Sequence, residues 1–380
     1  MTAPRRITVL LPVLGLIVVA VSGLTLLALV TVRVGPLAAA IGTAGALIPV
    51  VVVVAVFLWI DRWEPEPAKL LLSAFVWGAC IAAIIALLLN NTAATVGDLL
   101  LGRGNGGKIS ALLSAPLVEE AAKGAFVLGV LLRRRDEFDG VVDGIVYAGI
   151  TAAGFAFTEN IYYFGRAFAE HGFGDATSNG VVAAFVLRGV LSPFTHPLFA
   201  ALTGVGVGIA ARATNRAQRI LAPLGGYLAA VALHALWNGA ATLGGAQAFL
   251  DVYFLIMVPM FLAVALLVGL QRRREQRIIA AALPAMVRAR WIAASEVDLL
   301  TSLQGRRKWR RQARKESGPQ AAKAVAAYQA SVTELAFLKR RNGSAGNAAR
   351  ERELLATLRA ARAEAVKLAD EDSQTHDPGR

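Results

Sequence analysis

Long apolar runs separated by short polar segments fill most of the first 270 residues. Each run is at least as long as the ~20 residues that a helix needs to cross the hydrocarbon core of a membrane. The pattern predicts an all-α, polytopic membrane protein with about eight transmembrane helices. The eight runs are Ile7–Val32, Pro36–Ile60, Lys69–Leu89, Ile109–Leu132, Val141–Phe164, Val181–Ala211, Ile220–Leu243 and Phe249–Leu270.

The segments between the runs carry signals that end helices. The connector Asp61–Pro67 contains two prolines and Trp63, an aromatic residue suited to a membrane interface. Asn90–Lys108 and Gly165–Gly180 are polar and contain glycine, so we expect loops there. The Val181–Ala211 run contains Pro193 and predicts either a tilted or proline-broken helix or a re-entrant pair.

The composition changes after residue 270. Alanine-rich segments with helical spacing follow, and Gly318-Pro319 and Asn342–Gly346 separate them. The sequence therefore predicts two domains, a membrane domain at 1–270 and a basic, alanine-rich tail at 271–380. The tail is either a solvated set of helices with a disordered end or a coiled-coil or membrane-surface regulatory segment. Its predicted helices are Ile278–Leu303, Ala321–Lys339 and Ala348–Leu368.

Composition and charge support a membrane location. Hydrophobic residues make up 56% of the chain and charged residues 17%, which excludes an ordinary soluble domain. The net charge is +13, and the tail holds 23 of the 39 Lys and Arg residues, including the run Arg306–Lys315. A basic stretch directly after a span favours a cytoplasmic, lipid-facing segment, so we expect the lipid bilayer and no nucleic acid as its partner.

The distribution of basic residues also predicts the orientation. With the N-terminus in the cytoplasm, the inside segments hold 14 Lys and Arg residues and the outside segments four. This positive-inside bias predicts a plasma-membrane protein with both termini in the cytoplasm. The single cysteine, Cys80, excludes an intramolecular disulfide and a cysteine-based zinc site.

Ionisable residues inside the apolar runs indicate where chemistry occurs. A charged side chain in the membrane costs several kcal/mol unless it is paired or hydrated, so it marks function by default. Helical spacing brings a lysine within reach of two adjacent acids in the fourth run. Later runs add a third acid, two histidines and an asparagine that shares a helix face with the second histidine. These residues are Glu119, Glu120, Lys123, Glu159, His196, His234 and Asn238.

Carboxylates and imidazoles from separate spans suit an intramembrane hydrolytic site. A carboxylate can activate water, and an imidazole or a metal can stabilise the oxyanion. Two histidines and one glutamate also form a normal ligand set for catalytic Zn²⁺. Other interpretations remain open: a buried ion pair that only joins helices, a proton- or ion-coupled transporter, and a non-catalytic membrane scaffold.

The same residues occur in motifs that resemble a known family. Glu-Glu-x-x-Lys at 119–123, Phe-x-x-x-Glu-Asn at 155–160, the His196 segment and His-Ala-Leu-Trp-Asn at 234–238 follow in order. Together with Asp61–Pro67, Asp143-Gly144 and Tyr147-Ala148-Gly149, they resemble the PrsW family of bacterial intramembrane proteases. The likeness covers roughly residues 40–270. The wider group of CAAX prenyl endopeptidases has a longer first motif and a histidine at the position of Glu159.

The resemblance implies hydrolysis of a peptide bond in a membrane-anchored substrate, such as an anti-sigma factor, or maturation of a peptide or prenyl-like substrate. It implies that Glu119 or Glu120 is the general base for water, while the other acid orients the water or is held by Lys123. Glu159, His196 and His234 would bind a metal or stabilise the oxyanion, and Asn238 would support His234 or donate to the oxyanion. Zinc dependence stays open, and the sequence does not indicate an oligomeric state.

Overall fold

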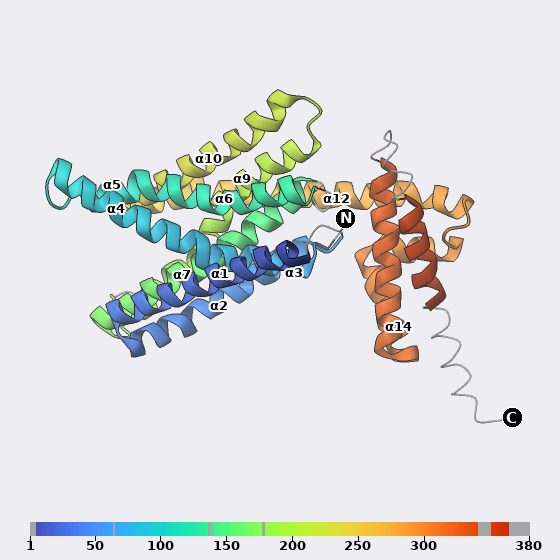
Figure 1. The fold of residues 1–380 in the computed structure, drawn as a ribbon, viewed down its shortest axis with the longest axis horizontal. Coiled ribbons are helices and arrows are strands. Elements are labelled where there is room, and N and C mark those ends of the chain that lie inside the picture. Colours follow the sequence, from blue (N-terminus) through green and yellow to red (C-terminus); the bar gives the residue numbers. More distant parts are fainter. Residues whose placement is uncertain are drawn as a thin grey trace. The chain divides into compact units, whose positions relative to one another are not determined.

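The structure, a computed structural model, describes residues 5–63, 65–135, 138, 140–176, 179–340 and 351–364. Throughout this part the regular structure is helical, and it contains no strand. The chain divides into two compact units (Figure 1). The membrane unit comprises Met1–Asp61 and Glu66–Leu267, and the tail unit comprises Arg62–Pro65 and Val268–Arg380.

The membrane unit confirms the all-α, polytopic prediction. Seven helices in the described part are long and apolar enough to span a bilayer. The remaining predicted run, Ile109–Leu132, is also helical. It is not among these seven because it contains three charged residues. The seven candidate spans are Val13–Val34, Pro36–Ile60, Ala68–Leu101, Val141–His171, Val181–Arg212, Arg216–Leu243 and Gly245–Arg288.

Several spans are built from consecutive helical segments with a short π-helical stretch between or beside them. A π-helical turn widens the backbone and leaves some of its carbonyl groups without their usual partner. The α-helices of the membrane unit are α1 (Arg5–Val34), α2 (Pro36–Ile60), α3 (Ala68–Val76), α4 (Ala83–Leu101), α5 (Gly106–Ile109), α6 (Ala115–Arg133), α7 (Val141–His171), α8 (Val181–Phe185), α9 (Thr195–Arg212), α10 (Arg216–Leu243) and α11 (Gly245–Val252). Its π-helical stretches are η1 (Trp77–Ala82), η2 (Ser110–Ser114), η3 (Val186–Leu191) and η4 (Tyr253–Met257).

Two predicted loops were wrong in extent. Within Asn90–Lys108, α4 continues to Leu101, and within Gly165–Gly180, α7 continues to His171. In the first case Asn91, Thr92 and Thr95 are exposed, whereas Asn90 faces the interior of the unit and hydrogen-bonds to Glu119 and Ser114. Asn90 therefore marks a polar site inside the membrane unit and not the end of the span.

Helix α7 lies at the centre of the membrane unit, packed against α2, α3 and α9, while α9 packs in turn against α10 (Figure 1). Glycines allow this close approach. A Cβ atom added to Gly144 would lie 2.0 Å from the carbonyl oxygen of Gly204 on α9, and one added to Gly154 would lie 2.0 Å from that of Phe75 on α3. Small residues at helix crossings are typical of membrane proteins.

The Val181–Ala211 run is a broken helix, as one of the sequence interpretations expected. The helical stretch α8–η3 ends at Leu191, and α9 starts at Thr195, with Pro193 in the turn between them. The break covers residues 192–194 and places His196 in the first turn of α9.

The tail unit has a hydrophobic core of its own. The core includes Ile279, Leu283 and Met286 of α12, together with Tyr328 and Leu335 of α14. The described part of the tail is therefore a packed helical unit rather than a set of separate solvated helices. Its elements are the C-terminal part of α12 (Val258–Arg288), η5 (Ala294–Glu296), α13 (Val297–Leu300), α14 (Leu303–Arg340) and a helical stretch at 351–364.

The predicted tail helices are only partly correct. The segment Ile278–Leu303 is not one helix, because α12 ends at Arg288 and Arg290 adopts a positive φ of 58°. The predicted break at Gly318 is confirmed, since Ser317 and Gly318 have non-helical backbone angles within α14. Asn342–Gly346 and the ends of the Ala348–Leu368 segment lie outside the described residues.

Candidate active site

A buried ion pair on α6 forms the base of the site. Glu120 and Lys123 are one helical turn apart, and both side chains are almost completely buried. The ammonium of Lys123 donates to Glu120 Oε1 at 2.6 Å and lies 4.6 Å from the ring centroid of Phe155. Lys123 therefore holds Glu120, although the spacing allowed it to reach either acid.

His234 on α10 packs against this pair. Its Nδ1 lies 2.9 Å from Glu120 Oε1, and because a carboxylate only accepts hydrogen bonds, the ring nitrogen donates. The ring also stacks on Phe199 with centroids 4.8 Å apart. Both contacts fix the imidazole, and they leave its Nε2 as the nitrogen with a free electron pair.

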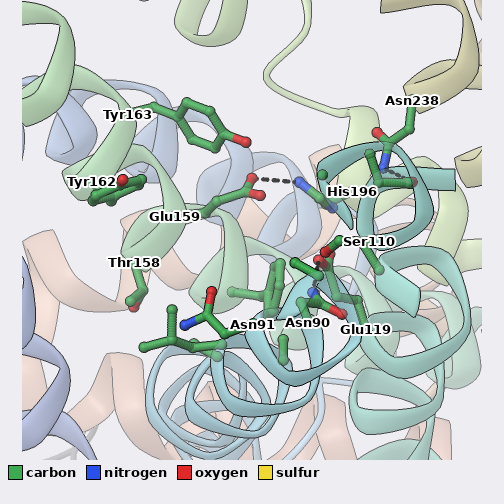
Figure 2. A pocket seen from close by; sticks show the side chains of 18 of the residues that line it. Asn90, Asn91, Ser110, Glu119, Thr158, Glu159, Tyr162, Tyr163, His196 and Asn238 are labelled. Atoms are coloured by element: carbon green, nitrogen blue, oxygen red, sulfur yellow. Dashed lines mark hydrogen bonds and ion pairs between the residues drawn. The ribbon is translucent and has the colours of Figure 1, made fainter. Parts of the chain in front are cut away.

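His196 on α9 is held in a similar way by a different acid. Its Nε2 lies 2.8 Å from Glu159 Oε2 on α7, so this nitrogen donates to the carboxylate (Figure 2). Its Nδ1 lies 3.3 Å from Lys123 Nζ. Phe155 packs edge-on against the ring with centroids 5.3 Å apart, as expected for a residue on the same face of α7 as Glu159.

Arg188 of η3 fixes Glu159 in turn. Its guanidinium pairs with Glu159 through Nη2 and donates from Nε to Asn160 Oδ1 at 2.7 Å. The guanidinium also lies 4.0 Å from the ring centroid of Tyr163. One arginine thus contacts Glu159, Asn160 and Tyr163 within about one turn of α7 and holds the Glu159 carboxylate toward His196.

Glu119 differs from the other acids because part of its carboxylate has no partner. Asn90 of α4 donates to Oε1 at 3.2 Å, while Oε2 is buried without a hydrogen-bond partner. This oxygen lies 3.9 Å from His234 Nε2. Among the described residues, Glu119, His196 and His234 form a group whose potential ligand atoms all lie within 4.8 Å of one another.

The group opens into a cavity of about 520 Å³. Glu119, Glu159, His196, His234 and Asn238 all line it, and Figure 2 shows Glu159 and His196 directed toward each other across it. The amide nitrogen of Asn238 donates to the carbonyl oxygen of Ala111 at 2.9 Å. Apolar side chains of α1 and α4 form much of the remaining wall.

The chain is similar to known proteins. The profile of the PrsW family, described as intramembrane metalloproteases, matches residues 66–264. The chain belongs to the PrsW family. Protease PrsW of Geobacillus kaustophilus is 31% identical over 173 residues, which is 46% of this chain and 68% of the relative. Protease PrsW of Oceanobacillus iheyensis is 32% identical over 171 residues, or 45% and 70% of the two chains. No solved structure matches.

The PrsW match confirms the expected peptidase, and the apolar helices confirm a multi-pass membrane protein. The match begins at Glu66, so α1 and α2 lie outside it, as does the tail unit. Helix α1 nevertheless contributes Leu26, Leu29, Val30 and Arg33 to the wall of the cavity.

The structure brings all seven sequence-predicted site residues around one cavity or directly behind it, but it groups them differently. The predicted ligand set was Glu159, His196 and His234. In the structure Glu119 joins the two histidines, while Glu159 is engaged by Arg188 and by one histidine. Glu120 lies behind the histidines and supports His234.

Two residues of the site were missed by sequence reasoning. Arg188 lies in the apolar Val181–Ala211 run, and a lone arginine within a span is itself a signal of an acidic partner. Asn90 was assigned to a loop, and no local pattern pointed to its contacts with Glu119 and Ser114.

Proposed function

We propose that this protein hydrolyses a peptide bond of a membrane-anchored protein, with Glu119, His196 and His234 as metal ligands and Glu159 as the general base. The convergence of these two histidines and Glu119 from three helices of the membrane unit carries the proposal. It exchanges the roles of Glu119 and Glu159 relative to the sequence-based expectation.

The residues present fit a catalytic zinc ion. Two histidines and one carboxylate with an open position are a common donor set for catalytic Zn²⁺. The buried Oε2 of Glu119 lacks a hydrogen-bond partner, and a bound cation would satisfy it. Each histidine donates one ring N–H to a carboxylate, an arrangement that orients metal-binding imidazoles in many proteins. The other nitrogen of His196, Nδ1, lies 3.3 Å from the Lys123 ammonium, so Lys123 would have to release it for a metal to bind there.

When bound, Zn²⁺ would lower the pKa of a water molecule and polarise the scissile carbonyl group. The carboxylate of Glu159 lines the same cavity, and Arg188 stabilises its charged form by direct pairing. This pairing keeps Glu159 unprotonated, so that it can accept a proton from the attacking water. The same pairing lowers its basicity, which favours the return of that proton to the leaving nitrogen.

The remaining predicted residues then have supporting roles. Glu120 orients His234, and Lys123 balances the charge of Glu120 in a site from which water is largely excluded. Asn238 uses one amide hydrogen for Ala111, and its second is available to donate to the substrate carbonyl oxygen as that atom becomes negative.

The position of the cavity supports a substrate that is cut near one membrane surface. Its lining residues fall at 26–33 of α1 and 234–242 of α10, toward the C-terminal end of each helix, and at 155–163 of α7, from its midpoint toward its C-terminal end. These ends lie on the face opposite to the N-terminus, because α1, α7 and α10 run in the same direction in the proposed topology. With cytoplasmic termini, the cut falls on the outer side of the plasma membrane, as in an anti-sigma factor with a single span.

The experiment measures metal content and substrate cleavage in the same preparations of the full chain. The variants are Glu119→Gln, Glu159→Gln, His196→Ala and His234→Ala, with Glu170→Gln on the exposed surface of α7 as control. Zinc should be about one ion per chain in the wild type, and it should be lost in the Glu119 and histidine variants. The Glu159 variant should retain zinc and lose cleavage of a single-span reporter protein.

Two results would overturn the assignment. Loss of zinc in Glu159→Gln with retention in Glu119→Gln would restore the sequence-based ligand set. A wild-type preparation that cleaves the reporter but contains no metal would show a glutamate-based hydrolysis instead.

A further inference from the structure

Arg306, near the start of α14, is a buried cation in the tail unit. It is 5% exposed, and its guanidinium lies 5.1 Å from the ring centroid of Trp63. It donates from Nε to the carbonyl oxygen of Leu300 at 2.9 Å and from Nη1 to Thr333 Oγ1 at 2.7 Å. Its Nη2 is buried and has no hydrogen-bond partner among the described residues.

These contacts fix the charge of Arg306 without neutralising it, because both of the acceptors named above are uncharged. A buried charge without a counter-ion is unfavourable. Burial, reinforced by the nearby charge of Arg310, accordingly lowers the pKa of Arg306 to about 10. The group is therefore a place where a bound anion would stabilise the unit.

Further arginines surround this buried charge. Arg310 follows it by one helical turn on the same face of α14, and Arg62 precedes Trp63 in the connector. Arg310 lies close enough to Arg307 and Arg62 for their charges to repel, and Arg62, Arg307 and Arg310 are all exposed. Glu275 offsets part of the positive charge beside Arg272, which is near the same residues.

We propose that Arg62, Arg307 and Arg310, above the buried Arg306, bind the phosphate group of an anionic phospholipid. The exposed guanidinium groups would donate to the phosphate oxygens, and Arg306 would add a fixed positive charge beneath them. This surface is called the arginine site below.

Chain connectivity favours a lipid as the source of the phosphate. Arg62 follows the end of α2 at Ile60 by two residues, and α3 starts at Ala68. Helix α12 continues without interruption from the apolar Val258–Leu270 stretch into Arg272. Basic residues that follow directly after spans lie where the headgroups of anionic lipids are concentrated. This inference does not depend on the proposed catalytic roles.

The test uses the full chain purified in a neutral detergent. Its melting temperature and its lipid-bound fraction by native mass spectrometry are measured with short-chain phosphatidylglycerol, short-chain phosphatidylcholine or inorganic phosphate. The double variant Arg62→Gln/Arg310→Gln is compared with Arg314→Gln/Lys315→Gln, which makes the same change in charge farther along α14. Phosphatidylglycerol should bind and stabilise the wild type and the control.

The arginine-site variant should bind phosphatidylglycerol about 30-fold more weakly, since each basic group near an anionic lipid contributes about fivefold. Its melting temperature without lipid shows whether it is folded. Equal binding of phosphatidylcholine, or equal losses in both double variants, would refute the site. Equal stabilisation by inorganic phosphate would show a free anion as the ligand, and displacement of the lipid by a short oligonucleotide would show a nucleic-acid surface. Either result would overturn the proposal.

Discussion

Replacing Arg188 tests how the site is held in place. Arg188 pairs with Glu159 and with Asn160, and both members of the ion pair are about three-quarters buried. Arg188→Ala removes the partner of a carboxylate that also positions His196. Arg188→Lys keeps the charge but cannot reproduce two divergent N–H donors in one plane.

The structure gives an estimate of the effect. Arg188 acts on His196 only through Glu159, as an outer partner of a proposed metal ligand. Loss of such a partner typically costs 10–100-fold in metal affinity or activity. This corresponds to about 1.4–2.7 kcal/mol. We expect Arg188→Ala to lose cleavage toward the upper end of this range and Arg188→Lys to lose about tenfold.

The assay is cleavage of a single-span reporter by the full chain in liposomes, with zinc content measured on the same samples. Arg166→Ala provides a matched control, because Arg166 also pairs with a glutamate on α7 but both members of that pair are about half exposed. Exposed pairs contribute 0–1 kcal/mol, so this variant should keep wild-type activity.

A cleavage rate of Arg188→Ala within twofold of the wild type would refute the reasoning, because it would show that Glu159 and His196 keep their positions without the arginine. Equal losses in Arg188→Ala and Arg166→Ala would also contradict it, since the effect would then come from α7 in general.

Three further predictions follow from other contacts. Asn90→Ala should lower cleavage about tenfold at unchanged protein level, because Glu119 loses its hydrogen bond; an unchanged rate would contradict this role. Gly154→Leu should prevent accumulation of folded protein, because its side chain would overlap the Phe75 carbonyl; normal yield and melting temperature would refute the close crossing. Burial raises the pKa of Asp61 to about 7, so the native state holds a proton that the unfolded chain releases above pH 4. Stability should therefore fall by up to about 1.4 kcal/mol per pH unit between pH 4 and 7, and Asp61→Asn should lose this slope in melting temperature.

The hydrophobic pattern was sufficient to predict the helical membrane architecture but not to predict where each helix ends. The run Pro36–Ile60 matches α2 residue for residue, because its ends coincide with a glycine and with the connector. The third span was cut short at Leu89, since Asn90 looked like the start of a loop. Hydropathy cannot tell a polar residue that faces an internal site from one that faces water.

The residues of the site could be predicted because charged and imidazole side chains are rare inside spans. Their pairing could not, because it depends on which helices are neighbours. Helical spacing related Lys123 to both Glu119 and Glu120, and only the position of His234 shows that Glu120 is the acid held from both sides. The partner of Glu159 is Arg188 in η3, 29 residues away, and no local pattern relates the two positions.

The π-helical stretches explain why polar residues are needed near this site even where they do no chemistry. A widened turn frees backbone carbonyl groups, and a buried carbonyl without a partner costs about 1–3 kcal/mol. In the membrane unit, side chains from other helices donate to carbonyl groups within three of these stretches. The pairs are Thr158 Oγ1 with Ala79 O of η1 at 2.7 Å, Asn238 Nδ2 with Ala111 O of η2 at 2.9 Å, and the Tyr253 hydroxyl with Leu191 O of η3 at 2.7 Å.

These bonds connect the site to the fold. The η2 stretch directly precedes α6, which carries the paired acids, and η3 carries Arg188. The backbone distortions therefore lie next to residues whose positions determine the geometry of the site. Each distortion is stabilised by a polar side chain from a different span, which fixes the relative positions of the helices that carry the acids and the histidines. Asn238 therefore has a structural role that is independent of any contact with substrate. An asparagine in an apolar run suggests a catalytic role. The hydrogen bond from Asn238 to the carbonyl oxygen of Ala111 is already a sufficient structural reason for its presence.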